Sequence, residues 1–210
     1  LDSAEVIIQS FNDSFILGKL EFMKAQNSLH ENDLKNALEL LDNCIDCFEM
    51  AENKPFIIAA LIEKIKVYIE VGENDKALKV VRKVETQLQK MEFSDFDLVL
   101  KSIKCVLNVN NITKQDVDTI EQSLDNLKLT ERFISYWYLA QAYFGIDEEE
   151  QSEHCHDLSK SLLIEAANRN SKLEDRDKYL HNIYFHKRIQ EDLKKKAKVI
   201  DDTSKENIFT

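Results

Sequence analysis

The chain has 210 residues but only three glycines and one proline, far fewer than turns and sheet edges normally require. Its formal net charge of −11 at pH 7 opposes a surface that attracts nucleic acid or an anionic membrane. Hydrophobic residues make up 43% and charged residues 32% of the chain, which excludes an intrinsically disordered protein and is typical of amphipathic helices.

Apolar residues recur three and four positions apart along most of the chain, and this periodicity predicts an all-α fold of about nine helices. The connections between them are short, so we expect neighbouring helices to run antiparallel. The predicted helices cover residues 4–29, 33–52, 55–71, 74–91, 94–108, 113–128, 130–144, 150–170 and 173–200.

Several predicted boundaries carry residues that favour helix ends. Pro55 stands at a helix start, where its missing N–H donor is not needed, and Gly72 stands just beyond a helix end. Asn32-Asp33 and Asn74-Asp75 open the following helices, and their side chains can accept hydrogen bonds from free backbone N–H groups. These signals divide the first half of the chain into helix pairs.

A short internal repeat supports the pairs. Asn36-Ala37-Leu38 and Lys76-Ala77-Leu78 lie 40 residues apart, and each opens the second helix of a pair. Such a period suits helix hairpins stacked side by side. Since one pair cannot bury its own apolar face, its neighbours must cover it, and the chain is predicted to form a solenoid.

The second pair carries a recognisable motif, Ile65-x-x-Tyr68-x-x-x-Gly72-x-x-x-x-Ala77. It resembles the tetratricopeptide pattern, in which an apolar residue, an aromatic residue, a turn glycine and a small residue follow one another at this spacing. The resemblance implies antiparallel helix pairs stacked as a right-handed solenoid that binds protein.

Weaker copies extend this resemblance to about two thirds of the chain. Residues 25–37 keep the spacing with Ser28 and Asn32 in place of the aromatic residue and the glycine, and Ala140-x-x-Tyr143 opens a further copy. The family's period of about 34 residues is not kept, so the resemblance implies lengthened helices.

The last third carries a second motif: Leu163-x-Glu165-Ala166-Ala167, then Leu173-x-Asp175-Arg176-x-x-Tyr179-Leu180-x-Asn182-Ile183 and His186-x-x-Ile189. It resembles the C-terminal repeat tail of large bacterial signalling proteins, which join an ATPase-like core and tetratricopeptide repeats to a kinase or a nucleotide cyclase. The sequence departs from that pattern at Tyr184, where a proline is usual. The resemblance implies a regulatory tail whose catalytic domains lie outside this chain.

These observations predict three regions: tetratricopeptide-like repeats over 1–172, a capping helix over 173–200 and a disordered tail over 201–210. The chain begins at Leu1 and not at a methionine, so we expect it to be cut from a longer polypeptide or processed. Neither a membrane span nor a secretion signal is visible in the sequence. We therefore expect a cytoplasmic protein.

Cysteines and histidines offer two candidate metal or redox clusters. Cys44 and Cys47 have the spacing of a zinc or redox pair, but no second pair follows and both fall in the middle of a predicted helix. His154 and His156 point about 200° apart on a helix, so they cannot share one ion. His181 and His186 are also poorly spaced on the predicted last helix. We predict no metal site.

A catalytic constellation is not evident either. The three glycines are isolated, so no phosphate-binding loop exists. Acidic residues occupy 39 positions, and pairs of them at helical spacing carry little information. The sequence predicts that the chain is not an enzyme and takes no cofactor.

The densest unusual feature is an aromatic stretch between Phe133 and Phe144 that includes Trp137. Aromatic residues that face several directions suit a helix buried on two sides, and alternatively some of them line a concave groove and anchor a peptide. By analogy with tetratricopeptide folds, groove positions lie on the first helix of each pair. The predicted groove residues are Phe22, Gln26, Ile62, Lys66, Trp137 and Gln141.

Two functions of the same physical kind follow. The favoured one is a protein–protein interaction and regulatory scaffold module within a larger signal-transduction protein, and the alternative is a stand-alone peptide-binding receptor of the helical-repeat type. The expected partner is a protein, a peptide or another domain of the same polypeptide, and neither nucleic acid nor membrane is expected. A groove that grips a terminal carboxylate is disfavoured because the chain is acidic.

Overall fold

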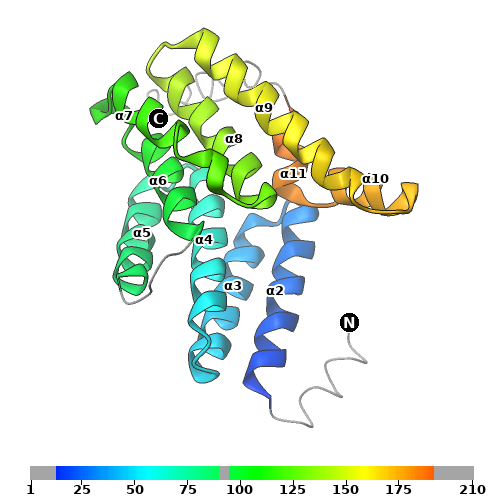
Figure 1. The fold of residues 1–210 in the computed structure, drawn as a ribbon. Helices are drawn as coiled ribbons and strands as arrows, with labels where there is room; N and C mark the ends of the chain where they lie inside the picture. Colours follow the sequence, from blue (N-terminus) through cyan, green and yellow to red (C-terminus); the bar gives the residue numbers. More distant parts are fainter. Residues whose placement is uncertain (1–12, 90–94, 192–210) are drawn as a thin grey trace, which may run out of the picture.

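The computed structural model describes residues 13–89 and 95–191 (Figure 1). Within these ranges the protein is all-helical, as predicted, and it has ten α-helices where about nine were expected. The helices are α2 (Ser14–His30), α3 (Leu34–Met50), α4 (Lys54–Glu70), α5 (Asn74–Leu88), α6 (Asp95–Leu107), α7 (Lys114–Glu121), α8 (Leu129–Gly145), α9 (Glu149–Asn168), α10 (Leu173–His181) and α11 (Tyr184–Gln190), with 3-10 turns η1 (Val109–Asn111) and η2 (Leu124–Asn126).

Four turns between helices share one backbone geometry. Each has a residue with a left-handed backbone: Asn32 (φ 62°), Glu52 (φ 52°), Gly72 (φ 75°) and Asp147 (φ 62°). In each turn the next N–H donates to the carbonyl five residues back, as Glu73 does to Tyr68 at 2.9 Å, which is the Schellman arrangement of a helix end.

This geometry explains the 40-residue repeat. Helices α3 and α4 have 17 residues each, and each is followed by a three-residue turn. The second helices of two successive pairs, α3 and α5, therefore begin 40 residues apart, at Leu34 and Asn74. Ala37 and Ala77 occupy the same position in these two helices, and both have an exposed fraction of 0%.

Side chains cap the starts of four of the described helices, α2, α3, α4 and α7. Asp33 Oδ1 accepts from Asn36 N at 3.1 Å, as predicted, and Thr113 forms a reciprocal capping box with Asp116. Helix α5 begins at Asn74, as predicted, but its cap differs from the prediction: Asn74 lies inside the helix, and the preceding residue Glu73 makes no side-chain cap hydrogen bond.

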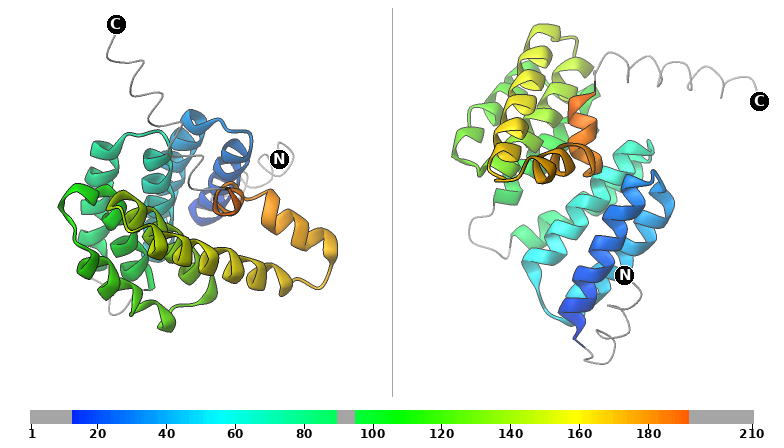
Figure 2. Two further views of the ribbon diagram at one scale, coloured as in Figure 1. Left: turned by 90° about the horizontal axis from the view of Figure 1, so that it is seen from above. Right: turned by 90° about the vertical axis from the view of Figure 1, so that its right-hand side faces the viewer.

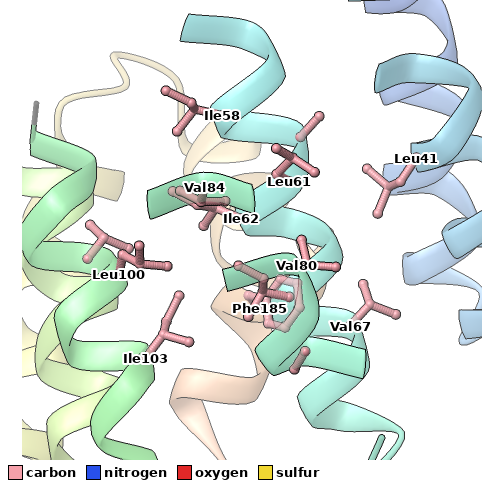
Figure 3. Close-up of a cluster of buried hydrophobic side chains, with 14 of the residues drawn as sticks. Leu41, Ile58, Leu61, Ile62, Val67, Val80, Val84, Leu100, Ile103 and Phe185 are labelled. Atoms are coloured by element: carbon pink, nitrogen blue, oxygen red, sulfur yellow. The ribbon is translucent and has the colours of Figure 1, made fainter. Parts of the chain in front are cut away.

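The helices pack neighbour to neighbour along the chain (Figure 1). Helices α2 and α3, α4 and α5, and α8 and α9 form antiparallel pairs, whereas α6 packs between the second pair and α8. Most buried apolar residues belong to one cluster that reaches from α2 to α11. Figure 3 shows part of it, with side chains of α4, α5 and α6 and with Phe185 of α11. A second cluster joins α6, α7, α8 and α9.

Two predicted helices are interrupted. The helix expected over 113–128 ends at Glu121, and the separate 3-10 turn η2 follows it at Leu124–Asn126. Leu124 and Leu127 are both buried in this arrangement. The one expected over 173–200 breaks after His181, because Ile183 adopts an extended backbone (φ −95°, ψ 118°). The chain reverses there, and α11 lies between the α8–α9 pair and the α2–α4 helices (Figure 2). The predicted tail at 201–210 lies outside the described residues.

Candidate interaction site

The six predicted groove residues lie on the first helix of three pairs, α2, α4 and α8, as expected. Three of them, Ile62, Lys66 and Trp137, are buried, with exposed fractions of 6%, 4% and 2%. The other three, Phe22, Gln26 and Gln141, are half-buried. Ile62 and Lys66 on α4 and Trp137 on α8 are therefore covered, and α11 is part of the cover of Lys66 and Trp137.

Phe185 of α11 brings two of the predicted residues together. Its ring centroid lies 6.2 Å from that of Trp137 on α8, and Lys66 Nζ on α4 lies 4.3 Å from the centroid of the Phe185 ring. Phe185 itself is only 3% exposed. A lysine cation against an aromatic face is an attractive contact that strengthens when water is excluded.

Glu70 of α4 anchors the outer side of α11. Its Oε2 accepts from Arg188 Nε at 3.2 Å and from the Tyr184 hydroxyl at 3.4 Å. The Glu70 side chain is 5% exposed and the Arg188 side chain 21% exposed, so the ion pair is largely shielded from water. Burial, followed by the charge of Glu70, raises the pKa of Tyr184 to about 12.

Two histidines hold the other side of α11. His156 of α9 donates from Nε2 to the Ile189 carbonyl at 2.8 Å, which satisfies a carbonyl that the end of a helix leaves without an intrahelical partner. His186 of α11 packs edge-on against Phe133 of α8 at 5.2 Å between ring centroids. Burial lowers the pKa of His186 to about 4, so its ring is neutral at physiological pH.

We call the residues beneath α11 the docking face: Lys66 and Glu70 of α4, Phe133 and Trp137 of α8, and His156 of α9. Charged groups also lie beside it. Lys66 forms an ion pair with Glu63, and the second carboxylate oxygen of Glu63 is buried without a hydrogen-bond partner among the described residues. The docking face thus combines aromatic contacts with charges of both signs.

The aromatic stretch follows the structural interpretation for most of its members. Phe133, Tyr136, Trp137, Tyr138 and Tyr143 are all buried, because α8 packs against α6 on one side and α9 on another. Two of them, Phe133 and Trp137, also contact α11. Phe133 and Trp137 are therefore both buried in the core and in contact with the helix that covers the predicted groove.

The cysteine pair lies in mid-helix, as predicted, on α3. Burial raises the pKa of Cys44 to about 12 and also raises the pKa of Cys47, so both thiols are protonated and weakly nucleophilic at neutral pH. His156 is buried whereas His154 is exposed, which agrees with their predicted divergence. The sequence predicts His181 and His186 on one helix, but they lie on two different helices, α10 and α11.

Residues 13–89 and 95–191 contain neither a metal-ligating cluster nor a membrane-spanning helix. No group of three or more His, Cys, Asp or Glu residues in these ranges is arranged to hold a metal ion. None of the helices there combines the length and apolar character that crossing a membrane requires.

Sequence reasoning missed Glu70, Phe185 and Arg188 at this site, and it considered His156 only as a metal ligand. Their spacing within α4, α9 and α11 carries no signal, because their partners lie on helices far away in the chain. The motif over 173–189 marked the segment but not the direction in which it turns. No protein-family model matches the chain, and comparisons with curated proteins and with solved structures give no match either.

Proposed function

We propose that this chain is a protein–protein interaction and regulatory scaffold module, built from tetratricopeptide-like helix pairs stacked as a right-handed solenoid. The observation that carries the proposal is the docking face, where the first helices of two pairs hold a short helix of distant sequence through an aromatic anchor and an ion pair. Binding an amphipathic helix by its apolar anchors is a common mode of peptide recognition.

The repeated turn supports the solenoid part of the proposal. Left-handed residues at positions 32, 52 and 72 recur every 20 residues, so successive helices enter and leave their turns in the same way. These equal turns join α2, α3, α4 and α5, helices of nearly equal length, and so support a regular arrangement of the first two pairs. That regularity is what a stack of helix hairpins requires.

We further propose that the module belongs to a larger signal-transduction protein, as the motif over 173–189 suggests. Its partner is then another domain of the same polypeptide or a second protein. Reading the parent gene on both sides of this segment tests the point directly. A kinase, cyclase or ATPase domain beside it supports the proposal, whereas a gene that ends at both borders of this chain favours the stand-alone peptide receptor.

The interaction itself is tested by affinity capture from the native host with the full chain as bait. Glu70→Lys reverses the charge that anchors the docking face, and Glu39→Lys makes the same change at an exposed position of α3. We expect a partner that wild type and Glu39→Lys retain and that Glu70→Lys loses. A partner retained equally by all three chains would move the interaction to another surface, and the absence of any retained partner would contradict the proposal.

A further inference from the structure

Helix α11 cannot owe its helical form to itself. It has seven residues, and isolated helices shorter than about 12 residues are marginal in water. Three of its residues, Phe185, His186 and Ile189, are buried, so its conformation is held by the docking face. Helix α11 therefore resembles a short peptide that is helical because it is bound, with the difference that it is covalently part of the chain.

The surface beneath α11 tolerates exposure better than an ordinary core. Lys66 and Glu70 are charged groups in contact with α11, so they regain water when α11 leaves, whereas in the docked state their desolvation opposes the gain from their ion pairs. Contacts between separable parts of a protein are typically more polar than permanent ones. The chemistry of the docking face is therefore that of a reversible contact.

The segment that carries α11 is also weakly attached. Helix α10 has no buried residue, and Leu173 at its start is 79% exposed. Arg176 Nε of α10 donates to the carbonyl of Asn170, in the turn that joins α9 to α10, at 2.8 Å. Tyr179 packs against His186 of α11 at 4.5 Å between ring centroids, so α10 and α11 can leave the body together.

From these observations, and on the basis of the function proposed above, we infer that α11 is a built-in competitor for the partner site. The partner that fits this site is a basic amphipathic helix with an aromatic residue, a basic residue three positions later and an aliphatic residue four positions later. Phe185, Arg188 and Ile189 display this pattern. The aromatic ring meets Lys66 and Trp137, and the basic residue meets Glu70.

Charge selects the partner over other occupants. Glu70 is a largely shielded carboxylate, and an apolar helix would not replace the ion pair that Arg188 makes with it, so the buried charge would lose a compensating partner. The net charge of −11 attracts a basic segment and repels a second copy of the same acidic chain. A partner must also overcome the high effective concentration of a tethered α11, so binding is weak until α11 is released.

The test uses the full chain and a labelled synthetic peptide with the sequence of residues 179–191. Phe185→Ala removes the aromatic anchor of the attached helix and leaves the docking face unchanged. We expect the peptide to bind the Phe185→Ala chain at least about tenfold more tightly than wild type, because the competing state is depleted. Fluorescence anisotropy measures the two dissociation constants, and circular dichroism verifies that the variant chain is folded.

A charge exchange tests the specificity of that binding. A peptide that carries Arg188→Glu should bind the Phe185→Ala chain at least about tenfold more weakly, and adding Glu70→Arg to the chain should restore its binding. A folded Phe185→Ala chain that fails to bind the original peptide would overturn the inference. So would a charge exchange without rescue, since the peptide would then bind elsewhere.

Hydrogen exchange on the wild-type chain decides the matter even if Phe185→Ala unfolds. We expect the amides of α11 to exchange at least about tenfold faster than those of α8, because α11 opens without the body. Equal rates would show that α11 is an inseparable part of the core. A wild-type dimer in light scattering that exchanges α11 between copies would also overturn the inference, because a second chain would then be the occupant.

These outcomes are independent of the search for a cellular partner. Peptide binding to the Phe185→Ala chain without a partner in the native host would contradict the proposed function alone. A host partner lost by Glu70→Lys, combined with equal exchange rates in α8 and α11, would contradict only the role of α11.

Discussion

Replacing Ala77 with leucine tests the contact that repeats along the chain. Ala77 lies in the first turn of α5, has an exposed fraction of 0% and belongs to the large apolar cluster. Leucine adds three carbon atoms at a point without free space. Inserting extra carbons into a packed core destabilises a protein by about 1–3 kcal/mol.

This magnitude translates into a measurable change of melting temperature. In proteins of about 150–250 residues each kcal/mol shifts Tm by roughly 2–4 °C, so we expect Ala77→Leu to lower Tm by about 2–12 °C. Ala37 occupies the same position 40 residues earlier and is equally buried. The change Ala37→Leu should therefore lower Tm by a similar amount.

Thermal melts followed by circular dichroism at 222 nm provide the assay. Lys79→Leu is the matched control, because it introduces the same side chain at an exposed position two residues further along α5 and should change Tm little. Unchanged melting of Ala77→Leu would refute the assigned register of the paired helices. A large effect at Ala77 with none at Ala37 would refute the equivalence of the two pairs.

Three other predictions follow from individual sites. Gly72→Ala should destabilise the chain by about 0.5–1 kcal/mol in urea denaturation, because alanine disfavours the left-handed backbone. The space around Gly72 is open, so the added methyl group meets no neighbour. An unchanged urea midpoint of unfolding would contradict this prediction. Tyr143→Phe should lower the unfolding free energy by about 1–2 kcal/mol. The Tyr143 hydroxyl links α8 to α7, because it lies 2.6 Å from Asp118 Oδ1 and 2.7 Å from Glu121 Oε2. Unchanged stability in urea would show that water replaces this link without loss. Burial lowers the pKa of His186 from 6.5 to about 4, so between pH 6.5 and pH 4 the histidine takes up a proton when α11 undocks, and α11 is held less firmly as the pH falls through this range. Hydrogen exchange of α11 should therefore be faster at pH 5 than at pH 7 after correction for the intrinsic exchange rate. The same pH dependence in His186→Gln would refute the role of the histidine.

Local signals in the sequence predict most of the helices. The spacing of apolar residues predicts each described helix except the division between α10 and α11, and Gly72 and Asp33 mark the ends of helices where a left-handed turn or a cap is needed. These features depend on residues within about one or two helical turns of one another. The repeat of Ala37 and Ala77 also lies within reach of the sequence, since equal helices and equal turns preserve it.

The contacts of the docking face join residues far apart in the chain, so local sequence patterns could not predict them. The analogy with tetratricopeptide folds placed Lys66 and Trp137 on the first helices of their pairs, but it could not show that Phe185 contacts both. Tertiary packing divides the last predicted helix at Ile183, because an extended residue there lets Phe185, His186 and Ile189 become buried.

The sequence by itself determined that the chain consists of amphipathic helices in pairs, because each helix is specified by neighbours a few residues away. Only the tertiary structure decided what fills the space between α4 and α8. Arg188 and Glu70 are 118 residues apart, and their meeting depends on the angles of every turn between them. Small differences in those angles accumulate along the chain, so the pattern of any single segment cannot fix the contact.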